Sequence, residues 1–151
     1  MPIQPTMVVQ NYGQQDKRIN MKWLFKEKNC TEKDINRIET KFDVALPKEY
    51  IEVVLQFNGA YPEFNTYDTD TQKGKIVQAL LSCLDEPMNV DEITNLINLR
   101  GVVAFLSDPF GNYICFQYFL DKSYNIILWN HEDKSIEIVS DSFVDFLNKL
   151  Y

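Results

Sequence analysis

Apolar residues recur at helical spacing early in the chain. Ile35, Ile38 and Phe42 repeat at intervals of three or four positions, which predicts a helix over residues 32–42. The run Thr31-Glu32-Lys33-Asp34 resembles a capping box, with aspartate in place of the usual glutamate. The pattern therefore predicts both this helix and the place where it begins.

A second helix is predicted to open at Leu46-Pro47, with Pro47 in its first turn. Proline suits the first helical turn because it has no N–H to pair there, and Tyr50 and Val54 fall on one stripe. Gly59 would end this helix, since glycine readily takes the left-handed conformation. A partial stripe over residues 17–28 predicts a further short helix upstream.

Two more helices are predicted in the second half of the chain. One begins at Asn89, and the other is capped by Asp141 or Ser142 and has apolar residues at i, i+3, i+4 and i+7. The apolar face of the first would consist of Ile93, Leu96 and Ile97.

Between these helices, apolar runs separated by turn residues predict an antiparallel meander. The four runs are residues 102–106, 113–119, 125–130 and 135–139. Residues 108–112 supply turn chemistry, because they contain proline, glycine and asparagine, and residues 131–134 would make the turn between the last two runs. Upstream, residues 76–84 predict a buried strand, and residues 61–67 a strand or an ordered loop.

Together these elements predict an α+β fold. We expect a mainly antiparallel sheet of about five to six strands, flanked by N-terminal helices and closed by a C-terminal helix. Residues 1–15 are polar with two prolines and predict a flexible arm, although Val8-Val9 could add a short edge strand. Residues 16–151 would form a single domain.

The net charge of −7 is unevenly distributed. Residues 1–50 carry a net charge of +2, and residues 51–151 carry −9. An acidic domain repels phosphate backbones, so we expect no direct nucleic-acid binding. It would attract a basic protein and speed the encounter, although ordinary solubility charge explains the same surplus.

The residues needed for catalysis or metal binding do not gather in the sequence. His131 is the only histidine, and we expect it to have a structural or surface role. Cys30, Cys83 and Cys115 are scattered and odd in number, which excludes a complete disulfide framework and offers no zinc-ligand spacing. We therefore expect no enzymatic activity, no metal and no cofactor.

The apolar stretches are too short for targeting or membrane insertion. Residues 1–20 lack the apolar run of about 7–15 residues that a signal peptide needs. The longest stretch, residues 76–84, is well below the roughly 20 residues of a membrane span. We expect a cytoplasmic protein without membrane association, either a monomer or a weak homodimer paired through an edge strand.

In their order along the chain, short motifs resemble the SUKH superfamily, also called the Smi/Knr family. They are Ile38-Glu39, Leu46-Pro47 with Tyr50, Asn58-Gly59, the strand end at Asp108 with Gly111-Asn112, Trp129 with His131, and Ser142-Phe143 with Phe146-Leu147. The resemblance covers about residues 31–151, and Ala60 and Pro109-Phe110 depart from it where members often have glycine. It implies a bacterial immunity protein that neutralises a polymorphic toxin, often a nuclease. The alternative is a non-enzymatic intracellular scaffold or regulator of cell-wall synthesis.

Acidic residues in the middle of the chain are the best candidates for partner contacts. They lie in loops or at a helix start beside aromatic residues, a combination that suits a basic, partly apolar protein. The predicted contact residues are Tyr61, Glu63, Tyr67, Asp68, Asp70, Asp85, Glu86, Asp91 and Glu92. We expect this face to occlude the substrate groove of a toxin, although a merely solvated surface is the alternative at each position.

Overall fold

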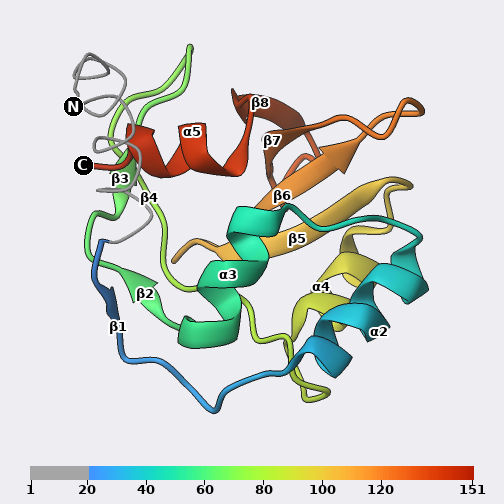
Figure 1. Cartoon of the computed structure of the whole chain (residues 1–151). Helices are drawn as coiled ribbons and strands as arrows, with labels where there is room; N and C mark the ends of the chain where they lie inside the picture. Colours follow the sequence, from blue (N-terminus) through green and yellow to red (C-terminus); the bar gives the residue numbers. More distant parts are fainter. Residues whose placement is uncertain (1–20) are drawn as a thin grey trace, which may run out of the picture.

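The computed structural model describes residues 21–151, which have the α+β fold predicted from the sequence (Figure 1). The elements are β1 (Trp23–Leu24), α2 (Glu32–Phe42), α3 (Lys48–Phe57), β2 (Tyr61–Pro62), β3 (Thr66–Tyr67), β4 (Lys75–Ile76), α4 (Val90–Ile97), β5 (Val102–Ser107), β6 (Tyr113–Tyr118), β7 (Tyr124–Trp129), β8 (Ile136–Ser140) and α5 (Phe143–Lys149). The predicted arm over residues 1–15, with Val8-Val9, lies outside the described residues. Within them, no helix has the length and apolar character needed to cross a membrane.

The main sheet is an antiparallel meander in the order β5-β6-β7-β8, which confirms the predicted topology. It has four strands, fewer than the five to six expected. The short strands form two separate antiparallel pairs, β1 with β2 and β3 with β4. Each of these strands has only two residues, so it offers too few backbone groups to extend the main sheet.

Residues 76–84, expected as a buried strand, run beside β5 without forming a regular strand beyond Ile76. Leu80 meets β5 at one isolated bridge. The amide of Leu80 donates to the carbonyl of Ala60 at 2.9 Å, whereas the amide of Leu81 donates to β5 at 2.9 Å. The amides of this segment that donate to β5 are those of Gln78 and Leu81, which are three positions apart instead of the two of a regular strand, so no continuous ladder forms. Apolar residues of this segment are nevertheless buried.

The described part of the helix expected over residues 17–28 is not helical. Trp23 and Leu24 instead pair with β2. The amide of Lys22 also donates to the carboxylate of Glu63 at 2.8 Å. These long-range bonds occupy backbone groups that a helix would use. The sequence at the partial apolar stripe also has no capping residue that would stabilise the start of a helix.

The helix starts agree with the sequence signals. The amide of Thr31 donates to Asp34 at 2.9 Å, as in a capping box. Asn89 and Ser142 each accept an amide hydrogen bond from the residue three positions later, at 2.8 Å and 3.1 Å. Pro47 occupies the cap position just before α3, one residue earlier than expected.

The buried face of α4 differs by one residue from the prediction. Ile93 and Ile97 are buried as expected, but Leu96 is 62% exposed. Val90 completes the buried stripe, since it lies three residues before Ile93 on the same side of the helix. The hydroxyl of Thr94 also faces inward and accepts a hydrogen bond from β5.

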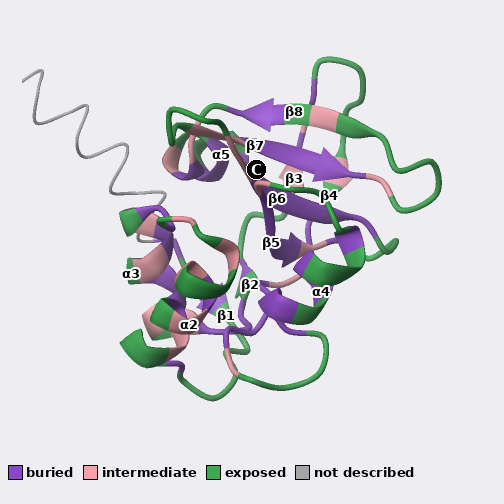
Figure 2. Cartoon of the chain, turned by 90° about the vertical axis from the view of Figure 1, so that its right-hand side faces the viewer, coloured by how far each residue is buried: buried purple, intermediate pink, exposed green. Residues whose placement is uncertain are grey.

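An aromatic cluster joins α3 and α5 to the main sheet. The ring of Tyr50 on α3 makes edge contacts with Phe105 and Phe116 on the sheet and with Phe143 on α5. Phe105 and Phe116 stack with their centroids 4.1 Å apart. Figure 2 shows the central strands and the inner faces of the helices as buried. Four of the ten phenylalanines, Phe105, Phe116, Phe143 and Phe146, are thus buried in the core.

Candidate partner-binding surface

Residues 84–88, here called the acidic loop, separate two cavities. The acidic cavity has a volume of about 440 Å³ and is lined by residues that include Lys41, Asp85, Glu86, Asp91 and Glu92. The groove has a volume of about 330 Å³ and is lined by residues that include Glu27, Tyr61, Glu86, Met88, Asp108 and Tyr113. Glu86 and Pro87 line both, so the acidic loop forms the wall between them.

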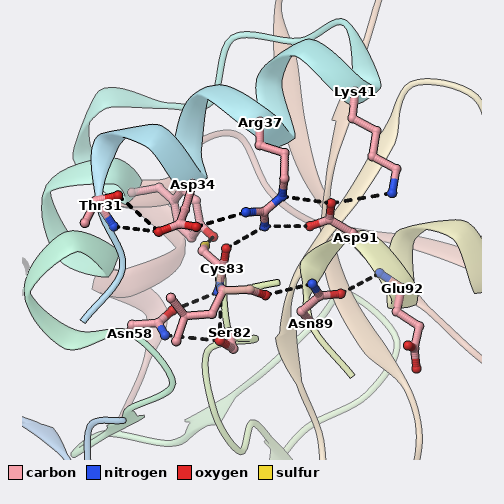
Figure 3. A network of polar contacts seen from close by, with 12 residues as sticks. Thr31, Asp34, Arg37, Lys41, Asn58, Ser82, Cys83, Asn89, Asp91 and Glu92 are labelled. Carbon is pink, nitrogen blue, oxygen red and sulfur yellow. Dashed lines mark hydrogen bonds and ion pairs between the residues drawn. The ribbon is translucent and has the colours of Figure 1, made fainter. Parts of the chain in front are cut away.

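Arg37 on α2 ties the segment before the acidic loop to the helix that follows it (Figure 3). Its guanidinium donates to the carbonyl oxygen of Cys83 at 2.7 Å. It also donates to the two carboxylate oxygens of Asp91, at 3.2 Å and 3.3 Å, and to Asp34 at 2.9 Å. One side chain therefore connects three parts of the chain at this site.

Asn58, at the end of α3, holds the same segment from the opposite side. Its side-chain oxygen accepts the amide hydrogen of Cys83 at 2.9 Å, and its nitrogen donates to Ser82 at 3.1 Å and to the carbonyl of Lys28 at 3.0 Å. Asn58 is fully buried, so each of these bonds replaces a lost bond to water. Figure 3 shows the amide directed at Ser82 and Cys83.

Asn89 closes the far end of the acidic loop. Its amide nitrogen donates to the carbonyl of Leu84 at 2.7 Å, while its oxygen accepts the amide hydrogen of Glu92 at 2.8 Å. The same residue therefore spans the loop and caps α4. Both ends of the acidic loop are fixed by buried side chains.

The charges beneath the acidic loop are paired. Burial alone would raise the pKa of Asp34, but hydrogen bonds from Thr31 and Arg37 outweigh it and lower that pKa. The hydrogen bond to Asp91 in turn raises the pKa of Arg37. Asp91 lies 3.5 Å from Lys41 as well, and it is buried.

The remaining carboxylates of the acidic cavity face solvent. Asp85, Glu86 and Glu92 are exposed, and Lys41 is the single basic residue among the described residues of the lining. Lys41 lies beside Asp91 and compensates that charge first. The outer part of the cavity is therefore acidic and accessible.

The thiol of Cys83, just before the acidic loop, is chemically quiet. Cys83 is fully buried, and its sulfur lies 3.3 Å from the hydroxyl of Tyr50. Hydrogen bonding to Cys30 and burial both raise the pKa of Cys83, so it stays a neutral thiol. Cys30, Cys83 and Cys115 are all free and buried.

Two exposed apolar side chains on a left-handed backbone, Phe25 and Met88, lie next to the groove and in its lining, respectively. Tyr61 contacts Phe25, which is 80% exposed, with a centroid distance of 6.1 Å and a φ of 59° at Phe25. On the acidic loop, Met88 is 57% exposed and has a φ of 61°. This conformation costs a residue with a Cβ atom about 1–3 kcal/mol.

Gly59 positions Glu27 at the edge of the groove. The φ of Gly59 is +75°, and a Cβ atom there would lie 2.7 Å from the carboxyl carbon of Glu27. The amide of Glu27 also donates to the carbonyl of Asn58 at 2.8 Å. Only glycine leaves room for the glutamate to lie over this turn.

Asp108 anchors the turn between β5 and β6 where it meets the groove. Its carboxylate accepts hydrogen bonds from the amides of Phe110 and Asn112, at 2.8 Å and 2.9 Å. The side-chain oxygen of Asn112 lies 2.9 Å from Nδ1 of His131, which joins this turn to the one between β7 and β8. His131 lines neither the acidic cavity nor the groove.

Residues 32–147 match the model of the family described as SMI1-KNR4 cell-wall, SUKH_6. The chain belongs to this family. The match confirms the SUKH resemblance that the sequence motifs indicate. No curated protein matches the chain.

In this SUKH chain, only some of the predicted contact residues come together. Asp85, Glu86, Asp91 and Glu92 line the acidic cavity, and Tyr61 lines the neighbouring groove. Asp91 is buried and ion-paired with Arg37, so it stabilises the fold below the surface and is not itself exposed to a partner.

The other predicted contact residues lie elsewhere in the SUKH chain. Glu63 accepts a backbone hydrogen bond at β1, and Asp70 is exposed just after β3. Asp68 accepts hydrogen bonds from Gly74 and from the hydroxyl of Tyr151, both at 2.8 Å. Tyr67 is fully buried, which corrects its placement on the surface. Its ring packs against α5 because it alternates with Thr66 across β3.

Four residues of the surface were not predicted from sequence. Glu27 and Asp108 come from distant segments, so no local pattern links them to the acidic loop. Phe25 and Met88 are apolar and therefore resemble core residues in a sequence pattern. Only their backbone conformation and exposure mark them as unusual.

Proposed function

We propose that this SUKH-family chain is an immunity protein that binds a toxin domain and blocks its substrate site. The observation that supports this is the acidic loop, which carries exposed carboxylates and lines two cavities. Arg37, Asn58 and Asn89 fix the backbone at its ends. The partner is a protein with a basic surface, such as a nuclease domain. The immunity protein acts in the cytoplasm as a monomer or weak homodimer, without a cofactor, a membrane or a nucleic acid.

The proposed mechanism is occlusion. A nuclease must carry positive charge where it holds phosphates, and Asp85, Glu86 and Glu92 offer negative charge in the same region of space. Opposite charges steer the two proteins together and raise the association rate toward about 10⁸ M⁻¹s⁻¹ at low salt. The docked immunity protein then excludes the substrate.

The fixed ends of the acidic loop favour tight binding. A loop that is already ordered loses little conformational freedom when the partner docks. Arg37 and Asn58 hold the residues before the loop, and Asn89 holds both of its ends together. The charged side chains of the loop are thus presented by a preformed backbone.

Co-expression with the product of the adjacent toxin gene tests the proposal. Cells should survive toxin expression with the wild-type chain, and survival should fall sharply with a variant that combines Asp85→Asn, Glu86→Gln and Glu92→Gln. The matched control combines Glu52→Gln, Glu132→Gln and Asp141→Asn, which removes equal charge from exposed positions outside both cavities. Death of cells that carry the wild-type chain would contradict the proposal.

The second candidate is a non-enzymatic scaffold or regulator of cell-wall synthesis. The matching family is described by the cell wall, which favours this alternative. Affinity capture of the full chain from its native cells distinguishes the two. Recovery of wall-synthesis proteins and no toxin would favour the regulator.

A further inference from the structure

The groove combines two features that the proposed charge complementarity does not require. Its lips are apolar: Tyr61 and Met88 line the groove, and Phe25 lies outside the lining but contacts Tyr61. Its described lining contains the carboxylates of Glu27, Glu86 and Asp108 but no basic residue. A purely electrostatic surface has no use for exposed apolar lips, because they add nothing to long-range attraction.

The backbone at the lips is strained for the residue types present. The other described non-glycine residues with positive φ are Asp43, Asn98, Lys122 and Lys134. Asp43 and Asn98 end helices, and all four are polar. Phe25 and Met88 have this conformation although their large apolar side chains are exposed. Hydrophobic burial of these side chains therefore offsets little of the backbone strain. Strain of this kind concentrates at binding sites.

The carboxylates of the groove are placed at different depths. Asp108 is 6% exposed, and both of its oxygens already accept hydrogen bonds within the β5–β6 turn, so it adds negative charge to the groove but no free oxygen pair. Glu27 and Glu86 are exposed and approach from different segments, near Gly59 and on the acidic loop. A ligand with a long apolar stem and a cationic end matches this arrangement.

We propose that the groove receives an arginine side chain of the partner, flanked by apolar residues that rest on Phe25, Tyr61 and Met88. Arginine fits because its planar guanidinium stacks on aromatic rings and pairs with carboxylates through two parallel hydrogen bonds. Its hydrocarbon stem packs against the apolar lips. This inference rests on the proposed function only in that the partner is a protein with a basic surface.

The groove and the acidic cavity would then be two parts of one interface. Glu86 and Pro87 line both, so a partner seated in one is adjacent to the other. Interfaces commonly place apolar anchors at the centre and charges at the rim. The groove supplies the anchor site, and the exposed carboxylates of the acidic cavity supply the rim.

A peptide titration tests the groove directly. The probe is acetyl-Leu-Arg-Leu-amide, added to the isotopically labelled full chain and followed by amide chemical shifts. The shifts should be largest near Phe25, Glu27, Glu86 and Met88. The same peptide with lysine should bind several-fold more weakly, and one with norleucine should cause no such shifts. Equal binding of the norleucine peptide, or shifts centred elsewhere, would overturn the inference.

Glycine substitutions separate binding from folding. Phe25→Gly and Met88→Gly remove the side chain and relieve the left-handed strain together, so thermal stability should not fall. Each should weaken binding of the arginine peptide and of the adjacent toxin gene product at least tenfold. Phe110→Gly and Leu120→Gly are controls at exposed apolar positions outside the groove, and their binding should stay within twofold of wild type.

The outcomes distinguish this inference from the proposed function. If the chain neutralises the toxin and the two groove variants bind it as wild type does, the arginine site is wrong while the immunity function stands. If the arginine peptide binds the groove and no toxin is neutralised, the site stands and the immunity function fails.

Discussion

Arg37 and Asp91 meet 54 positions apart in the sequence, through two hydrogen bonds of 3.2 Å and 3.3 Å. The same guanidinium reaches the carbonyl of Cys83 at 2.7 Å. The side chains are 30% and 10% exposed, so the pair is largely removed from water. It connects α2 to α4 across the base of the acidic loop, and the surface depends on it.

Loss of this pair should destabilise the fold. Arg37→Met should lower the free energy of unfolding by about 2–4 kcal/mol, because it leaves the buried carboxylate of Asp91 without its main partner. Urea unfolding followed by circular dichroism measures the change. Arg100→Met, at an exposed arginine, is the control and should cost less than about 0.5 kcal/mol. Equal stability of both variants would show that the pair is unimportant.

Asn58 should have a comparable effect through neutral hydrogen bonds. Asn58→Ala leaves the buried amide of Cys83 and the part-buried carbonyl of Lys28 without these bonds, at an expected cost of about 2–3 kcal/mol. Hydrogen exchange should also accelerate at Cys83 before global unfolding. Asn36→Ala, on the exposed side of α2, provides the comparison. Unchanged exchange at Cys83 would refute this role for Asn58.

Stability should fall in acid, partly through Asp34. Its pKa is lower in the folded chain than in the unfolded chain, so its contribution is complete above the unfolded value of about 3.9 and disappears as the pH falls through the folded value. Thermal melts between about pH 2 and pH 7 should show a decline that begins near pH 4. Asp34→Asn should be less stable at neutral pH and should show a shallower decline. A parallel curve for the variant would contradict the assignment.

His131 should be dispensable for neutralisation. Its side chain lies beside Asn112 and links two turns, which is a structural role at an exposed residue. His131→Ala should therefore lower the free energy of unfolding by no more than about 1 kcal/mol and leave protection from the toxin intact. Protection assays with the purified variant check this. If protection were lost while folding and toxin binding were preserved, a catalytic mechanism would have to be considered.

The predictable parts of the fold have local signals. The capping box at Thr31 and Asp34 determines the start of α2 through residues only three positions apart. The turn at residues 108–112 contains the proline, glycine and asparagine that let β5 and β6 pair. Such signals give the right elements because the interactions behind them are themselves local.

The other parts depend on partners that are distant in sequence. Residues 76–84 have the composition of a strand, but the amides that donate to β5, those of Gln78 and Leu81, are three positions apart, so a regular ladder does not form. Tyr67 looks like a contact residue in sequence, yet its ring is needed in the core against Phe146. No single window of sequence contains both members of these pairs.

The candidate surface shows the same division. Asp85 and Glu86 lie close to Asp91 and Glu92 along the chain, and a short loop is enough to bring them to one cavity. Glu27 joins them across the groove only because Asn58 and Gly59 hold it there, which sequence spacing does not reveal. The sequence shows that Asp91 is acidic, but it does not show that Asp91 is buried in an ion pair with Arg37, which lies 54 positions away.

The rate at which the chain associates with the adjacent toxin gene product, measured against salt concentration, tests the central claim most directly. Between about 0.01 M and 1 M salt the screening length shrinks from about 30 Å to about 3 Å. We expect the wild-type rate constant to fall at least tenfold over this range. The variant with Asp85→Asn, Glu86→Gln and Glu92→Gln should associate slowly throughout, with little salt dependence. A wild-type rate that does not change with salt, or one that the variant matches, would contradict the claim that the acidic loop attracts the partner.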